Sequence, residues 1–334
     1  MPSEPDPEHI RNLIVGYQKT AALRAAVDLH LFTAIAKGAS TVDTIAAKCQ
    51  ASPRGIRILC DYLTIEGLLT KENQTYDLSP DSAALLDERS PHYMGGMLRF
   101  LNAPRLLEAA AHLTETVRTG TTSAGEGFAG DEAEEWVAFA RHMQPMAAGP
   151  AKFIAELIVS SRPPKRVLDI AAGHGLYGIA IASLAPDALI VAQDWPKVLA
   201  VAEENARAAG LAERHQLLPG SAFEVDFGTG FDLVLLTNFL HHFDEPTCID
   251  FLRKVRAALY AGGRLAILEF VPNEDRVTPP RAAAFALSML LQTPAGDAFT
   301  QSDLFRMLDA AGFTSHEVVD IPKSPEKLIV SYVT

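Results

Sequence analysis

The stretch Val167–Gly178, VLDIAAGHGLYG, decides the fold of this 334-residue chain. Its apolar start predicts a buried strand that ends near Ala171, and Gly173 and Gly175 then form a turn in which backbone can approach a ligand closely. A helix is expected to begin near Leu176, and the free N–H groups of its first turn favour an anionic group. That group is either the carboxylate of a methionine moiety or a pyrophosphate.

Strands and helices alternate on the C-terminal side of this stretch. The predicted strands are short runs rich in Val, Leu, Ile and Ala, at 166–171, 188–194, 215–221, 231–239 and 263–271. Near-continuous apolar strands separated by helices are typical of a parallel sheet that is covered on both faces. Two last strands, 316–322 and 327–333, are too close together for a crossover and must form an antiparallel hairpin. We therefore expect a seven-stranded, Rossmann-like α/β sheet with a C-terminal antiparallel hairpin.

The first hundred residues predict a mostly α domain. One helical face is indicated by apolar residues at every fourth position, Leu23, Val27, Leu31 and Ile35. Two short helices follow, capped by Ser40 and Ser52, and a small hairpin spans 68–78. Helix, turn, helix and two-stranded wing predict a winged-helix domain. We expect three parts: a winged-helix domain at 1–100, a helical linker at 101–160 and a catalytic domain at 161–334.

Composition limits the classes of partner and compartment. The net charge is −12, and residues 1–100 hold ten Lys+Arg against twelve Asp+Glu, which disfavours nucleic acid. The acidic, proline-rich start does not resemble a signal peptide, and no apolar run is long enough to span a membrane. Three cysteines without ligand-like spacing indicate reduced thiols. We expect a cytoplasmic protein without membrane or nucleic-acid partners.

The glycine turn leaves two classes of cofactor open. Gly173, Gly175 and Gly178 satisfy the dinucleotide fingerprint, so an NAD-dependent oxidoreductase is one alternative. Asp194, at the end of the next predicted strand, can accept hydrogen bonds from both ribose hydroxyls of either cofactor. The terminal hairpin and Asp169 instead favour a nucleoside that carries an amino-acid moiety in place of the pyrophosphate of NAD. A carboxylate at Asp169 suits the cationic amine of an amino-acid ligand and would repel a pyrophosphate.

At these residues the chain resembles the class I methyltransferases, and more specifically the two-domain O-methyltransferases of plant caffeate and bacterial natural-product pathways. The resemblance covers nearly the whole chain and depends on the order and spacing of the matching segments, 167–175, 194–199, 219–223, 240–244, 261–269 and 300–313. It implies S-adenosyl-L-methionine as the cofactor, a homodimer formed through the N-terminal domain and a small-molecule acceptor. Cofactor contacts are implied for Asp169, Ala171, Gly173, Gly175, Asp194, Trp195, Ser221 and Ala222.

The resemblance also implies the catalytic residues. It places a general base at His241, after the strand at 231–239, and a carboxylate that orients the base at Glu269. A phenol is a poor nucleophile until its proton leaves, and an imidazole can accept that proton near neutral pH. Aromatic and methionine side chains suit a flat aromatic or polyketide-like acceptor. The positions that match the family's acceptor pocket are Phe139, Met143 and Met289.

Departures from the family pattern keep other functions open. Ala171 replaces a glycine, Ser221 replaces an acid that contacts adenine, and Ala298 replaces a second carboxylate beside the base. An N- or C-methyltransferase is therefore an alternative, since such a nucleophile can react without a base. A winged-helix DNA-binding regulator is a further alternative. We expect no metal, because the adjacent His241 and His242 of an extended segment point to opposite sides.

Overall fold

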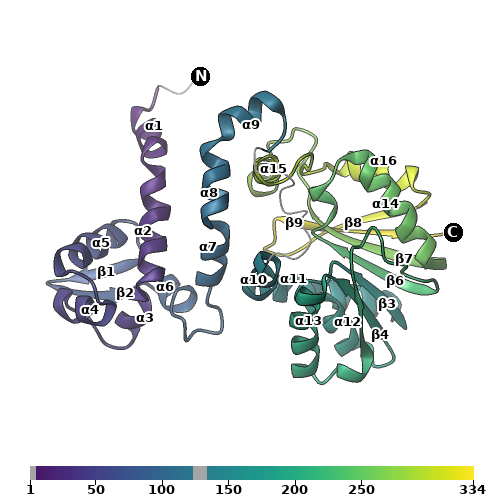
Figure 1. Ribbon diagram of the computed structural model, residues 1–334, viewed down its shortest axis with the longest axis horizontal. Helices are drawn as coiled ribbons and strands as arrows, with labels where there is room; N and C mark the ends of the chain where they lie inside the picture. The colour runs from purple at the N-terminus through teal and green to yellow at the C-terminus, as the bar shows by residue number, and fades with distance from the viewer. Residues whose placement is uncertain (1–4, 123–133) are drawn as a thin grey trace. The chain divides into compact units, whose positions relative to one another are not determined.

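The computed structural model describes residues 5–122 and 134–334, and the chain divides into two compact units, Met1–Asn102 and Ala103–Thr334 (Figure 1). Each unit is described by itself. Within the described ranges, no helix has the length and apolar character needed to cross a membrane. The three-part division with boundaries after residues 100 and 160 remains a prediction.

The N-terminal unit is mostly helical, with one small antiparallel hairpin. Its elements are α1 (Pro7–Ile14), α2 (Gly16–Asp28), α3 (Leu31–Ala36), α4 (Val42–Cys49), α5 (Pro53–Ile65), β1 (Leu69–Glu72), β2 (Thr75–Leu78), α6 (Pro80–Leu85) and α7 (Gly95–Leu101). Phe32, Ile45, Ile56, Leu63 and Tyr76 are among the side chains that form its buried core. The predicted order of helices followed by a hairpin is present.

Two local predictions in this unit are wrong. The apolar face from Leu23 to Ile35 belongs to two helices, because His30 adopts a left-handed conformation with φ +54° and ends the first. Apolar residues at every fourth position indicate which helical face is buried, but they do not indicate where one helix ends and the next begins. The cap of α4 is Thr41, whose hydroxyl accepts the N–H of Thr44, and not the preceding serine. The predicted cap Ser52 is confirmed by the Gly55 N–H, 3.0 Å from its Oγ.

The C-terminal unit is built on a seven-stranded sheet. Its strands are β3 (Arg166–Ile170), β4 (Leu189–Asp194), β5 (His215–Pro219), β6 (Phe231–Thr237), β7 (Leu259–Phe270), β8 (His316–Asp320) and β9 (Glu326–Tyr332). The spatial order is β5-β4-β3-β6-β7-β9-β8, with β3 to β7 parallel and β9 antiparallel to both β7 and β8. The predicted α/β sheet and its terminal hairpin are confirmed.

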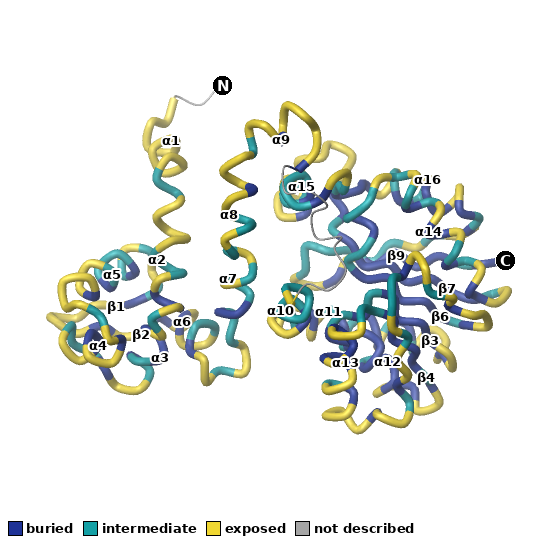
Figure 2. Tube along the Cα trace, viewed as in Figure 1, coloured by how far each residue is buried: buried dark blue, intermediate teal, exposed yellow. Residues whose placement is uncertain are grey.

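Helices cover both faces of the sheet. The helices described in this unit are α8 (Pro104–Ala111), α9 (Leu113–Thr119), α10 (Glu134–His142), α11 (Gln144–Ser161), α12 (Leu176–Leu184), α13 (Pro196–Ala208), α14 (Glu245–Ala258), α15 (Pro280–Gln292) and α16 (Gln301–Ala310). One buried cluster joins the sheet to α11 and α12, and another joins it to α14 and α16. Figure 2 shows the buried strands between these layers. The carboxyl ends of the parallel strands meet at one edge, which is where open α/β sheets bind ligands.

Candidate active site

The turn after β3 places three residues in the left-handed backbone conformation. Ala171, Gly173 and Gly175 have φ angles of +50°, +58° and +72°. A Cβ at Gly175 would lie 3.0 Å from the Cβ of Ala202 on α13, so packing also requires glycine there. A Cβ at Gly173 would meet only the Ala171 carbonyl oxygen within 4 Å, at 3.9 Å. Space beside Gly173 is therefore open to a ligand.

Asp194 connects the end of β4 to this turn. Its Oδ2 accepts the Gly173 N–H at 2.8 Å, and its Oδ1 accepts the Trp195 N–H at 2.7 Å. Burial raises the pKa of Asp194 to about 6, while the two backbone N–H groups oppose this shift. A carboxylate oxygen can accept more than one hydrogen bond, so both oxygens can also accept from sugar hydroxyls.

Asp169 lies beneath the turn and is completely buried. Its Oδ2 accepts the Gly178 N–H at 3.0 Å, whereas its Oδ1 has no hydrogen-bond partner among the described residues. Burial raises the pKa of Asp169 to about 7 against the opposing effect of the Gly178 N–H. A Cβ at Gly178 would lie 2.8 Å from both Asp169 Oδ2 and Ile190 Cγ2. Packing within the chain therefore accounts for the third glycine.

The loop after β5 joins the same edge. The Gly220 N–H donates to the Asp194 carbonyl oxygen at 3.0 Å. Ser221 Oγ accepts the Phe223 N–H at 3.3 Å, and Ala222 is buried. The predicted cofactor residues of β3, β4 and β5 are thus brought together at neighbouring strand ends.

A buried histidine–carboxylate pair lies at the ends of β6 and β7. His241 belongs to a single 3-10 turn, Leu240–His242, and its Nδ1 is 2.5 Å from Glu269 Oε2. Glu269 Oε1 accepts the N–H groups of Phe239 and Leu240 at 3.0 and 2.9 Å, and that of His241 at 3.4 Å. Because the carboxylate accepts the proton on Nδ1, the lone pair lies on Nε2. This arrangement fits a general base.

Aromatic rings surround the histidine. His242 lies against it with ring centroids 4.2 Å apart, and the His242 Nδ1–H donates to the Phe239 carbonyl oxygen at 3.1 Å. Burial, with His241 as a smaller cause, lowers the pKa of His242 to about 3, so His242 stays neutral. Phe285 of α15 meets His241 edge to face at 4.8 Å.

The predicted acceptor residues take different places around these rings. Phe139 on α10 contacts the ring of Trp136 at 5.6 Å, and Trp136 contacts His242 at 5.8 Å. Met289 is buried on α15, one helical turn beyond Phe285. Met143 is the N-cap residue of α11. A series of ring–ring contacts thus links Phe139, through Trp136, to the two histidines.

Comparison with known proteins assigns this geometry to a family. The model of an O-methyltransferase domain matches residues 126–314, and the model of an O-methyltransferase dimerisation domain matches residues 12–88. The first match covers more than half of the chain. The chain belongs to the O-methyltransferase family.

Relatives and solved structures agree with this assignment. The tetracenomycin polyketide synthesis 8-O-methyltransferase TcmO of Streptomyces glaucescens is 26% identical, over 92% of this chain and 91% of its own. The 3-hydroxy-5-methyl-1-naphthoate 3-O-methyltransferase of Streptomyces sahachiroi is 28% identical, over 87% and 85%. A crystal structure from Nostoc punctiforme, of a protein assigned to the O-methyltransferases, has a TM-score of 0.94 and 46% identity over 98% and 99%. PigF of Serratia, solved with S-adenosylhomocysteine, has a TM-score of 0.88 and 25% identity over 98% and 100%.

The family confirms the predicted reaction class of this O-methyltransferase and removes the oxidoreductase and the DNA-binding regulator as alternatives. On α5, Arg57 pairs with Asp61, which also accepts the Tyr76 hydroxyl. That arginine therefore belongs to an internal network. The roles of the individual site residues remain predictions.

Sequence reasoning missed two residues of the O-methyltransferase site. Gln193 accepts the Ala171 N–H through Oε1 at 3.3 Å, and its Nε2 donates to the Gly220 carbonyl oxygen at 2.6 Å. It therefore ties the loops after β3 and β5 together. Phe285 was missed as well, although it lies four residues before Met289 on the same helical face.

The carboxylate closest in sequence to the histidine pair of the O-methyltransferase is a helix cap. Asp244, close to His242 in sequence, caps α14 by accepting the Thr247 N–H at 2.9 Å. Across residues 5–122 and 134–334, no group of three or more His, Cys, Asp or Glu side chains has the arrangement of a metal site.

Proposed function

We propose that this O-methyltransferase transfers a methyl group from S-adenosyl-L-methionine to a hydroxyl of an aromatic or polyketide-like small molecule. The observation that carries the proposal is the buried His241–Glu269 pair, which lies at the same sheet edge as the glycine turn. TcmO and the naphthoate O-methyltransferase of Streptomyces sahachiroi support the acceptor class.

The strand ends of β3, β4 and β5 would hold the cofactor. Gly173 supplies open space beside the backbone, and Asp194 supplies a carboxylate that suits ribose hydroxyls. Further contacts would come from Gly175, Trp195, Ser221 and Ala222. Asp169 is sealed under the turn, so it would act on a cationic ligand through its charge and not through direct contact. When bound, the cofactor supplies an electrophilic methyl group on a sulfonium sulfur.

His241 Nε2 would accept the proton of the acceptor hydroxyl. Glu269 keeps the Nδ1–H in place through its Oε2 and stabilises the imidazolium that results. The low exposure of both side chains excludes water and strengthens their mutual attraction. Phe139, Met143 and Met289, together with Phe285, would form walls that hold a flat acceptor in line with the methyl group.

Ligand-dependent stability tests the cofactor. A ligand that binds the folded state raises the melting temperature. We expect S-adenosylhomocysteine to protect the protein against heat and NADH to leave its melting temperature unchanged. Protection by NADH alone would reject the cofactor assignment.

The variant His241→Ala tests the base. With a panel of phenols that includes hydroxynaphthoates, we expect kcat to fall by about a hundredfold or more, the scale of a lost general base. Protection by S-adenosylhomocysteine should persist in the variant and serves as the folding control. A fall of less than about threefold would reject His241 as the base.

We propose that the chain forms a homodimer through its N-terminal unit. Apolar side chains at Ile10, Leu13, Ile14 and Tyr17 are exposed along α1 and the start of α2, at helical spacing. The dimerisation-domain match over 12–88 includes most of this stripe and supports a second copy as its occupant. We also propose a reducing, cytoplasmic environment, since Cys49, Cys60 and Cys248 are free and buried.

A further inference from the structure

The turn that carries His241 begins at a residue in the left-handed backbone conformation. Asn238 follows β6 with φ +55°, and its N–H donates to the Leu268 carbonyl oxygen of β7 at 2.8 Å. The three residues after Asn238 direct their N–H groups at Glu269 Oε1. The conformation of Asn238 therefore sets the direction in which the chain enters the catalytic turn.

A carboxylate from the far end of the chain holds this residue. Asn238 Nδ2 donates to Glu326 Oε1 at 2.8 Å. The other amide atom of Asn238, Oδ1, is buried and has no hydrogen-bond partner within the described part of the chain. Glu326 thus provides the hydrogen bond that fixes the Asn238 side chain.

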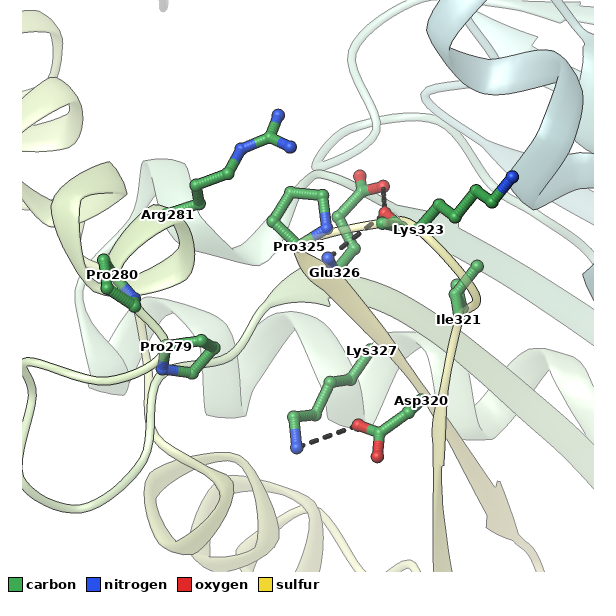
Figure 3. Close-up of a pocket in the computed structure, with 10 residues that line it drawn as sticks. Pro279, Pro280, Arg281, Asp320, Ile321, Lys323, Pro325, Glu326 and Lys327 are labelled. Atoms are coloured by element: carbon green, nitrogen blue, oxygen red, sulfur yellow. Dashed lines mark hydrogen bonds and ion pairs between the residues drawn. The ribbon is translucent and has the colours of Figure 1, made fainter.

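Glu326 is itself fixed by its own hairpin. It is the first residue of β9 and lies opposite Phe270 in the β7–β9 register, next to the pair formed by Glu269 and Lys327. Its Oε2 accepts the Ser324 hydroxyl at 2.7 Å. Figure 3 shows Glu326 among the residues that line a pocket of about 450 Å³.

The electrostatic effects on the Glu326 carboxylate are consistent with its position close to the proposed base. Burial is the main cause that raises the pKa of Glu326, and the charge of Glu269 raises it further. His241 acts in the opposite direction, as do the hydrogen bonds from Asn238 and Ser324. The Glu326 carboxylate therefore lies within electrostatic reach of the histidine–carboxylate pair.

We propose that Glu326 is a positioning residue that aims the catalytic histidine through Asn238. The inference rests on the proposed role of His241 as the base. A carboxylate acceptor makes a stronger hydrogen bond than a neutral one, and the hairpin around Ser324 restrains its position. Loss of Glu326 frees the amide of Asn238, and the turn then samples directions in which Nε2 misses the acceptor hydroxyl.

The variants Glu326→Ala and Glu326→Gln test the inference. We expect Glu326→Ala to lower kcat by about tenfold, with little change in the KM for S-adenosyl-L-methionine or in the KM for the acceptor. A small misplacement of a reacting group affects the chemical step most. Glu326→Gln should restore most of kcat, because its amide oxygen can accept from Asn238. The matched control is Asp320→Ala, which removes an exposed ion pair with Lys327 in the same hairpin and should leave kcat unchanged.

A double-mutant cycle separates positioning from a structural effect. In a His241→Ala background, Glu326→Ala should change kcat by less than twofold, because its effect passes through the histidine. Protection by S-adenosylhomocysteine, measured for every variant, reports folding. An unchanged kcat in Glu326→Ala alone, a full tenfold loss that persists without the histidine, or no rescue by glutamine would overturn the proposal. If His241→Ala retains full activity, both this inference and the proposed base fail.

Discussion

Ala171 adopts a backbone conformation that costs an L-residue free energy. With φ +50° it lies in the left-handed region, and its N–H is held by Gln193 Oε1. Its methyl group is small enough for the turn, which explains why alanine is compatible with the glycine-rich pattern. The strain remains as a local cost at the cofactor edge.

The variant Ala171→Gly should relieve this strain. Left-handed backbone costs roughly 1–2 kcal/mol for an L-residue, and the greater freedom of glycine in the unfolded chain offsets about 0.4–1 kcal/mol. We expect a free energy of unfolding higher by about 0.5 kcal/mol in urea titrations. Ala172→Gly is the control, because Ala172 has no positive φ and should lose stability. If Ala171→Gly and Ala172→Gly destabilised the protein equally, backbone strain at Ala171 would be ruled out.

Cofactor binding should weaken as the pH falls. Burial raises the pKa of Asp194 to about 6 and that of Asp169 to about 7, so both carboxyls take up protons in the free enzyme between pH 8 and pH 5. At pH 5 about a tenth of Asp194 is ionised, so we expect the Kd for S-adenosylhomocysteine to rise about tenfold or more. Isothermal titration at the two pH values measures this, and Asp194→Asn should flatten the slope. A Kd that is equal at pH 8 and pH 5 would contradict this prediction.

At the scale of elements, the sequence predicts strands better than helix breaks. Apolar runs report burial on both faces, and the short connection between β8 and β9 leaves an antiparallel hairpin as the only choice. The break at His30 was missed because apolar spacing reports which face is buried and not the φ angle of one residue. The contacts of Gln193, Phe285 and Glu326 depend on how distant elements meet, which one sequence does not report.

The cap of α14 should contribute measurably to stability. Asp244 accepts the Thr247 N–H and follows directly after the turn that carries the histidine pair. We expect Asp244→Ala to lower the free energy of unfolding by about 1 kcal/mol, the usual value for a lost N-cap. Asp244→Asn should retain most of it, since asparagine caps equally well. Chemical denaturation measures both, and an alanine variant as stable as the asparagine variant would contradict the cap.

At the scale of the whole molecule, the two units carry different tasks. The C-terminal unit contains every residue of the proposed chemistry, whereas the N-terminal unit exposes an apolar stripe that its own core does not use. Leu13 and Tyr17 in this stripe are 66% and 71% exposed. Such a surface is typical of a protein–protein interface.

A charge in the stripe should separate the dimer. We expect Leu13→Glu to convert the dimer to a monomer at micromolar concentration, because a buried, unpaired carboxylate costs several kcal/mol. Sedimentation velocity measures the change. Asn12→Glu places the same charge on the opposite face of α1 and should leave the dimer intact. A Leu13→Glu protein that stays dimeric would remove the stripe as the interface.

One oxygen of Glu269 accepts the N–H groups of three consecutive residues. This arrangement has a consequence for how the protein can evolve. The proposed proton removal would be organised by the ends of β6 and β7 with Glu326 of β9, whereas the surfaces that would select a molecule belong mainly to α10 and α15. Substitutions on those two helices at positions that do not contact His241, unlike Phe285, would then change selectivity without disturbing the proposed base. A scaffold divided in this way can acquire new acceptors by a few exchanges, without passing through inactive ancestors.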